Sequence, residues 1–164
     1  MSTRVYVPSS TEGLSNILLS GGVGPVPFLA HAVTDDLRSA LPDAGEEEWE
    51  YAALMSAAQD SLGLITDDDR PRRVVVVAEA DTVAPVSEGE PSLVEVVDVV
   101  PLRSVVAVHV DSEDAEEDVS AAREVWQTAQ EGDTAALASL DRCLEHELGW
   151  FATQEIGDLV ETPS

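Results

Sequence analysis

The chain has 164 residues, and its 33 acidic and 8 basic residues give a formal net charge of −25. All the basic residues are arginines and they form no basic stripe, which argues against direct binding to the phosphates of DNA or RNA. The lone cysteine, Cys143, excludes an intramolecular disulfide and a cysteine-rich zinc site, and no apolar run approaches the roughly 20 residues of a membrane helix.

The first half of the chain predicts two strands and three helices. Residues 4–7 alternate up to Pro8, as a strand does, and Ser9 with Glu12 three residues later matches a helix capping box. Residues 28–33 predict a second strand, and Thr34 caps a short helix. A longer helix from Glu46 to about Leu62 follows, with an apolar stripe that we expect to be buried, formed by Tyr51, Leu54, Met55, Ala58, Leu62 and Ile65.

The second half predicts three strands and two helices. Residues 73–80 contain four consecutive valines, which is typical of a central strand covered on both faces. Strands at 93–100 and 105–110 are separated by Pro101. Two amphipathic helices follow, the first with Val119, Ala122, Trp126 and Ala129 inward and the second with Leu137, Leu140, Leu144 and Leu148 inward.

The order βαβααβββαα predicts an α/β (α+β) fold, with a single mixed sheet of about five strands and helices packed on it. The first strand–helix–strand unit can be parallel, whereas the later, closely connected strands should pair antiparallel. We expect one domain over residues 1–160 and a frayed tail at 161–164, in a protein of the cytoplasm.

The most specific candidate site combines two histidines with neighbouring acids. His109 and Asp111 lie two apart at a strand end and so share a face, while His146 and Glu147 lie on the last helix. If that helix packs over the strand end, the four could bind a metal or act as acid and base. The zinc-protease helix motif is not complete, because Trp150 stands where the second histidine is required.

Two further groups are candidates for binding. Arg70, Arg72 and Arg73 could hold an anion through bidentate contacts, although neutralisation of residues 67–69 is the explanation that we favour. Trp49 and Tyr51 straddle an acidic helical turn, and we expect one of them to face outward as a contact for a partner protein.

Several stretches resemble a known family. Residues 4–8, 32–38, 47–53, 105–111 and 150–156 are similar to an uncharacterised family of small acidic actinobacterial proteins. The resemblance implies no activity, cofactor or site residue, since that family has no assigned function.

No assembled catalytic set is recognisable, so we expect no cofactor and a non-catalytic accessory domain that binds a protein with a basic surface. One alternative is a small enzyme or metal- or anion-binding domain that uses His109, Asp111, His146 and Glu147. Another is a nucleic-acid mimic, which requires carboxylates in ordered rows. The acidity also has a plain explanation in a GC-rich genome, which enriches Ala, Val and Asp and depletes Lys.

Overall fold

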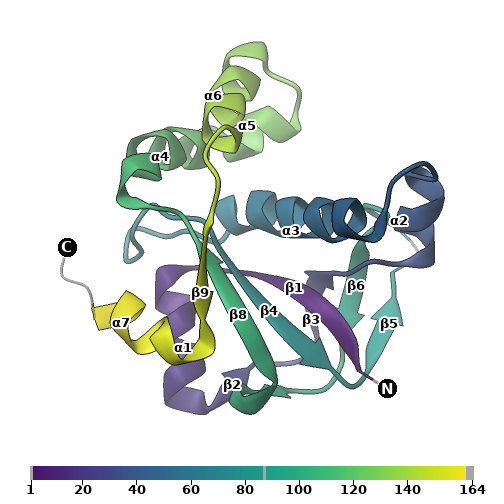
Figure 1. The fold of residues 1–164 in the computed structure, drawn as a ribbon. Helices are drawn as coiled ribbons and strands as arrows, with labels where there is room; N and C mark the ends of the chain where they lie inside the picture. Colours follow the sequence, from purple (N-terminus) through teal and green to yellow (C-terminus); the bar gives the residue numbers. More distant parts are fainter. Residues whose placement is uncertain (1, 87, 162–164) are drawn as a thin grey trace.

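We analysed a computed structural model of the chain, which describes residues 2–86 and 88–161 (Figure 1). Its main sheet has seven strands: β1 Thr3–Ser9, β3 Phe28–His31, β4 Val74–Ala80, β5 Val83–Pro85, β6 Leu93–Val96, β8 Val105–Val110 and β9 Gly149–Ala152. They lie in the order β5-β6-β3-β1-β4-β8-β9, and every neighbouring pair is antiparallel. A second, two-stranded sheet pairs β2 (Gly22–Val23) with β7 (Val100–Pro101).

Seven α-helices lie within the described ranges: α1 Thr11–Ser20, α2 Asp35–Ala40, α3 Glu46–Leu62, α4 Glu116–Glu124, α5 Trp126–Gln130, α6 Thr134–Leu144 and α7 Ile156–Glu161. Short 3-10 turns occupy Leu102–Ser104, Glu113–Ala115 and Thr153–Glu155. The helix α3 crosses one face of the main sheet, and α1 and α7 lie against the other face (Figure 1).

The strand β4 confirms the prediction for the valine run. It lies between β1 and β8, and Val74 to Val77 are all buried. Side chains alternate across a strand, so Val74 and Val76 pack with α1 and α7, whereas Val75 and Val77 pack with α3. The sheet therefore has two apolar faces, which is why its centre contains almost no polar side chain.

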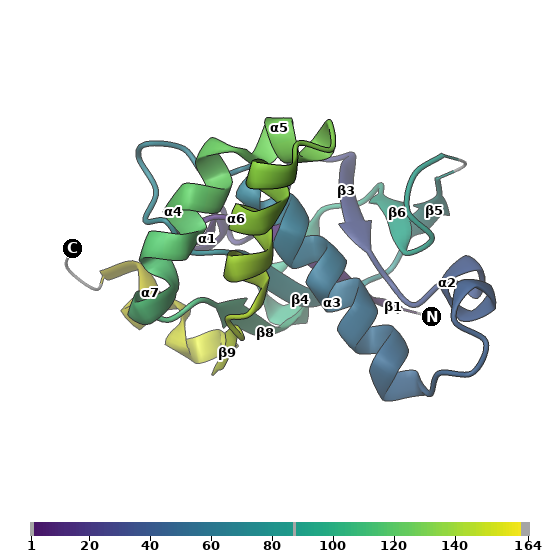
Figure 2. The same ribbon diagram turned by 90° about the horizontal axis from the view of Figure 1, so that it is seen from above.

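A helical lobe of α4, α5 and α6 packs beside α3 and away from the sheet (Figures 1 and 2). Its own core joins Leu62, the last residue of α3, and Ile65 in the following loop to Val119, Leu140 and Cys143. Because Leu62 and Ile65 belong to the lobe's core, the position of the C-terminal end of α3 depends on both the lobe and the sheet.

The combination of one principal sheet with helices is confirmed, but two details of the prediction are wrong. Five strands were too few, because short strands such as β5 and β9 exist only through pairing with a neighbour. The first strand–helix–strand unit is also antiparallel, with Tyr6 opposite His31, since residues 21–27 return the chain to the end of the sheet where β1 finishes. Of the expected frayed tail, Glu161 ends α7, and residues 162–164 lie outside the described residues.

The helix predictions need smaller corrections. Ser10, and not Ser9, caps α1, and its hydroxyl accepts a hydrogen bond of 3.1 Å from the Gly13 amide. The bounds of α3 are as predicted, but its buried face is shifted toward small residues and consists of Ala53, Ala57, Ala58, Ser61 and Leu62. Alanines at these positions let the helix axis lie close to the valine-covered sheet.

Candidate functional site

The structure does not join the four residues of the predicted metal or acid–base site into one centre. The Asp111 side chain is fully buried and forms hydrogen bonds of 2.8 Å to Nε and Nη2 of Arg73. His146 follows α6, and its Nε2 lies 2.7 Å from Oδ2 of Asp118 on α4. Glu147 is exposed to solvent.

His109 lies on β8 between Val75 and Trp150 of the neighbouring strands. Burial of its imidazole lowers the pKa of His109 below the ordinary histidine value. Across residues 2–86 and 88–161, no group of three or more His, Cys, Asp and Glu side chains could hold a metal ion. Because Asp111 is paired with Arg73 and His146 with Asp118, the four predicted residues do not form a shared metal or acid–base site in this structure.

The three predicted anion-binding arginines are engaged by acids from within the chain. Arg73 pairs with Asp111, and Arg70 and Arg72 both contact Oε2 of Glu116, at 2.8 and 2.7 Å. Burial opposes ionisation of Glu116, but the hydrogen bonds from Arg72 and Arg70 outweigh it and hold the pKa of Glu116 below its usual range. These arginines hold the start of α4 against the sheet.

Two of the three acids at residues 67–69 have partners other than these arginines. Asp67 pairs with Arg123 of α4 at 2.9 Å. Asp69 accepts hydrogen bonds of 2.8 Å from the backbone amides of Glu12 and Thr66. Burial opposes the charge of Asp69, yet these backbone hydrogen bonds lower its pKa overall, so Asp69 joins α1 to the loop after α3.

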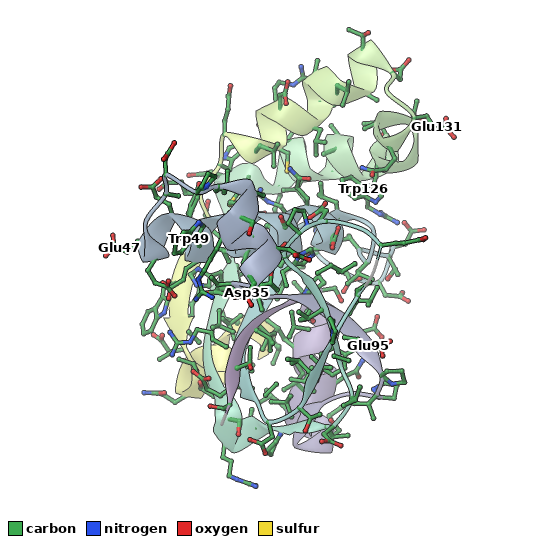
Figure 3. All side chains as sticks on the ribbon, turned by 90° about the vertical axis from the view of Figure 1, so that its right-hand side faces the viewer. Asp35, Glu47, Trp49, Glu95, Trp126 and Glu131 are labelled. Atoms are coloured by element: carbon green, nitrogen blue, oxygen red, sulfur yellow. The ribbon has the colours of Figure 1, made fainter. Side chains whose placement is uncertain are left out.

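Of the two aromatic residues, Tyr51 is the one that faces outward, with 57% of its surface exposed. Trp49 is half-buried at the start of α3 (Figure 3). Its Nε1 donates a 2.9 Å hydrogen bond to the Leu41 carbonyl, and the Arg38 guanidinium stacks 5.4 Å from its ring centre. Trp49 thus connects α2 to α3, whereas Tyr51 is the more exposed of the two candidate partner contacts.

A hydrogen-bonded chain of three residues that the sequence analysis missed connects the core to the surface. His31 ends β3 and is 1% exposed. Its Nδ1 lies 2.7 Å from Oγ of the buried Ser92, and its Nε2 lies 2.6 Å from Oδ2 of Asp60. Because an ionised carboxylate only accepts hydrogen bonds, the short contact to Asp60 is one in which Nε2 donates, while the Ser92 hydroxyl, which can donate or accept, is the partner of Nδ1.

Serine, histidine and aspartate are also the residue types of hydrolytic triads, but this arrangement does not suit nucleophilic attack. Ser92 is 2% exposed, so its hydroxyl cannot meet a substrate. The accessible member is Asp60, whose side chain is 39% exposed. What this chain of hydrogen bonds presents to solvent is therefore a carboxylate with a fixed orientation.

The backbone beneath Asp60 is held firmly. Its neighbour Ser61 is buried, donates a 2.7 Å hydrogen bond to the Ser9 carbonyl and accepts one of 3.0 Å from the Val74 amide. These two bonds join the last turn of α3 to β1 and β4 at once. The position of Asp60 is consequently determined by the centre of the sheet.

Asp60 lines one of two adjoining hollows beside α1, which together we call the α1 groove. The first hollow, of about 610 Å³, is bounded by the end of β1, one side of α1, the start of β3 and the end of α3. The second, of about 880 Å³, lies between the end of α1 and β7. The two hollows adjoin because they share part of their lining, namely Asn16, Ser20, Gly22 and Gly24.

Large apolar side chains stand exposed along the α1 groove. Leu29 and Leu64 line the first hollow and are 51% and 48% exposed. Leu19 and Val99 line the second and are 86% and 57% exposed. These four are close to half of the nine large apolar side chains that are exposed in the described part of the chain. Such a concentration is typical of a binding surface rather than of ordinary solvent-facing residues.

The sequence analysis could not find this groove. Asp60 and Ser92 lie 29 and 61 residues from His31, and no short motif links them. One signal was present, namely a histidine that ends an otherwise apolar strand in a chain with three histidines. A buried polar residue requires a hydrogen-bond partner, so a histidine in this position predicts polar residues packed around it in the core.

Comparison with known proteins places the chain in a family. The model of a family of unknown function, DUF6912, matches residues 3–160. No curated protein and no solved structure matches this chain. Within the described residues, the structure contains no helix with the length and apolarity needed to cross a membrane.

Proposed function

The chain belongs to the DUF6912 family, whose function is unknown, and we propose that it is a non-catalytic accessory domain that binds another protein through the α1 groove. The observation that carries this proposal is the cluster of exposed apolar side chains, Leu19, Leu29, Leu64 and Val99, around two adjoining hollows. Protein interfaces have this form, in which apolar anchors surround pockets that receive side chains of the partner.

The exposed leucines favour a protein over a small molecule as the occupant. A small-molecule site is a concave pocket that encloses most of the surface of its ligand. Leu19, by contrast, projects almost fully into solvent beside the second hollow. A partner that covers both the hollows and their rims would bury Leu19, and only a macromolecular surface is large enough to do so.

The charge favours a basic partner over a second copy of the chain. With a net charge of −25, two copies would repel each other, while a basic protein would be attracted and its association accelerated. The acidic residues do not need to lie in the interface for this long-range attraction to act. A protein with a basic surface therefore remains the expected partner.

The alternatives have weaker support. The enzyme or metal-binding alternative would require His109, Asp111, His146 and Glu147 to share a ligand, whereas Asp111 is buried against Arg73 and His146 pairs with Asp118. The mimic alternative requires ordered rows of carboxylates. The three acids labelled in Figure 3 that lie on α3, on β6 and just after α5, namely Glu47, Glu95 and Glu131, are well apart, and these three form no ordered row of carboxylates that would support this alternative.

The test is capture of the partner with matched variants. Tagged wild-type protein, Leu19→Asp and Leu137→Asp are expressed in the natural host, and the proteins that they retain are identified by mass spectrometry. Leu137 is an exposed residue of α6, so its variant introduces the same charge outside the groove. We expect one partner to be retained by the wild type and by Leu137→Asp, and lost from Leu19→Asp.

Direct binding of the purified partner then decides the proposal. Calorimetry should give a dissociation constant raised at least about ten-fold by Leu19→Asp and changed less than about two-fold by Leu137→Asp. Equal binding by all three proteins would reject the α1 groove as the interface. A dimer of the wild type that Leu19→Asp dissociates, measured by sedimentation, would assign the groove to self-association instead.

A further inference from the structure

We infer that Asp60 receives a lysine or arginine side chain from the partner, so that the α1 groove selects an apolar segment carrying one basic residue. This inference rests on the proposed function and names the chemistry of the bound segment. It starts from the first hollow, in which Asp60 is the sole charged residue among the described residues of the lining.

The carboxylate of Asp60 is only partly satisfied by the chain itself. Its Oδ2 lies 2.6 Å from Nε2 of His31. Within residues 2–86 and 88–161, no other side chain or backbone group forms a hydrogen bond with this carboxylate. An ionised carboxylate has about four acceptor positions, so Asp60 retains capacity for a donor that enters from the hollow.

The surroundings of Asp60 strengthen its attraction for a cation. Apolar side chains of Val7, Ile17 and Phe28 line the same hollow and reduce the local dielectric constant, which increases the energy of a charge pair. Asp60 also lies in the last turn of α3, where the helix dipole places partial negative charge. Among the described residues that line this hollow there is no arginine, and Arg103 lines the second hollow instead, so within the described chain His31 is the one basic side chain paired with the carboxylate.

The shape of the hollow suits the long stem of a basic side chain. Lysine and arginine pack their methylene groups against apolar surface while the charged end reaches a polar group. Leu29 and Leu64, both about half exposed, line the hollow that contains Asp60. A stem that lies along these leucines would place its ammonium or guanidinium group at the carboxylate.

His31 acts here as a positioning residue. It is held by the buried Ser92 on one side and holds Asp60 on the other, so one oxygen of the carboxylate is fixed before any ligand arrives. A carboxylate that is already oriented loses less conformational entropy on binding, which increases affinity. The buried histidine thus gives the core a direct role in recognition at the surface.

The test uses two probes with the same six-carbon chain, n-hexylammonium and n-hexanol, which differ in charge. Titration of ¹⁵N-labelled protein with each probe is followed by NMR, at pH 7.5 and at low and high salt. We expect both probes to shift amide signals of α1 and of residues 60–64. n-Hexylammonium should bind about five-fold more tightly than n-hexanol at low salt, and less so at high salt.

Two variants separate a local effect from a general one. Asp60→Asn should abolish the preference for n-hexylammonium and leave the affinity for n-hexanol within about two-fold of the wild type. Glu124→Gln removes one exposed charge from α4, outside the groove, and should keep the preference. Thermal unfolding of each variant verifies that it is folded.

The outcomes distinguish the inference from the function on which it rests. Equal affinities for the two probes, or a preference that survives in Asp60→Asn, would overturn the role of Asp60 and leave the apolar groove in place. If neither probe shifts groove amides at tens of millimolar, both the inference and the groove as a binding site are rejected.

Discussion

Arg73 and Asp111 form a two-pronged ion pair in the interior, with Nε to Oδ2 and Nη2 to Oδ1 distances both 2.8 Å and neither side chain exposed. The backbone amide of Arg73 also donates to Oδ2, at 2.8 Å, and Nη2 reaches the His146 carbonyl. This single pair therefore joins the start of β4, the end of β8 and the end of α6. One atom, Nη1 of Arg73, is buried without a hydrogen-bond partner in the described structure.

Replacing one partner of this pair should lower the free energy of unfolding more than replacing both partners does. We expect Arg73→Met to lower the free energy of unfolding by about 3–5 kcal/mol, because Asp111 would remain buried and unpaired. The double variant Arg73→Met/Asp111→Leu should be more stable than either single variant, since it leaves no buried charge. Urea unfolding followed by circular dichroism measures all four proteins, and additive losses would contradict the coupling.

His109 should make stability depend on pH near neutrality. Burial lowers the pKa of His109, so the folded protein favours the neutral imidazole more than the unfolded chain does. The contribution is complete above the unfolded-state value of 6.5 and is lost as the pH falls through the lower folded-state pKa. Wild-type protein should therefore lose more stability than His109→Gln between pH 7.5 and 5.5, measured by urea unfolding. Equal losses in the two proteins would show that His109 does not contribute to the pH dependence.

Glu116 should make stability depend on pH in a more acidic range than His109 does. Burial raises its pKa, but the hydrogen bonds from Arg72 and Arg70 lower it further than burial raises it, so the folded pKa lies below the ordinary value of 4.5. This stabilisation is present above pH 4.5 and is lost as the pH falls through the folded pKa. Glu116→Gln should flatten the decline of thermal stability below pH 4.5, whereas the exposed neighbour Glu117→Gln should not.

Cys143 should react slowly with thiol reagents until the helical lobe opens. Desolvation raises the pKa of Cys143 to about 11, and the side chain is fully buried. At pH 8 the thiolate fraction is then about a hundred-fold below that of a free cysteine, before steric exclusion is counted. Labelling with Ellman's reagent should be at least that much slower in buffer than in concentrated urea, and rapid labelling in buffer would show that the lobe is open.

Gly22 should tolerate no side chain. A Cβ atom at this position would lie 2.7 Å from the Val100 carbonyl oxygen, the backbone to which β2 is paired. Gly22→Ala should lower the free energy of unfolding by about 1–3 kcal/mol and shift the amide signals of Val23 and Val100. Gly157→Ala in α7 meets open space and should raise stability by about 0.5 kcal/mol, so a loss of stability in both variants would count against the steric explanation.

Local sequence patterns correctly predicted the helices and strands whose conformation follows from their own residues and not from distant partners. The bounds of α3 and β8 agree with the helical and alternating apolar patterns, and the valine run was correctly placed at the centre of the sheet. The predicted last helix, by contrast, extended to Leu148, while α6 ends at Leu144. The chain leaves the helix there, and the His146 carbonyl accepts a hydrogen bond from Arg73, which is 73 residues away in sequence.

The candidate site was harder to predict because its members meet only in the folded chain. His109 and Asp111 share a strand end as expected, but the sequence pattern contained no indication that Arg73 would bind Asp111 across 38 residues. The groove depends on how residues 21–27 return to the sheet and on the pairing of Gly22 with Pro101. Both features are set by contacts between residues far apart in the sequence, to which the local propensity for helix or strand contributes little.

The last described helix completes the core begun by the first. Ile156 of α7 is fully buried in the same cluster as Leu14 and Ile17 of α1 and Val74 and Val76 of β4. During translation, α1 and the β4 valines are synthesised before the residues near 156. The core that they share cannot be completed until those later residues leave the ribosome. Nascent protein is expected to need chaperone protection over this interval, and truncation before Ile156 should yield aggregates rather than a smaller native fold.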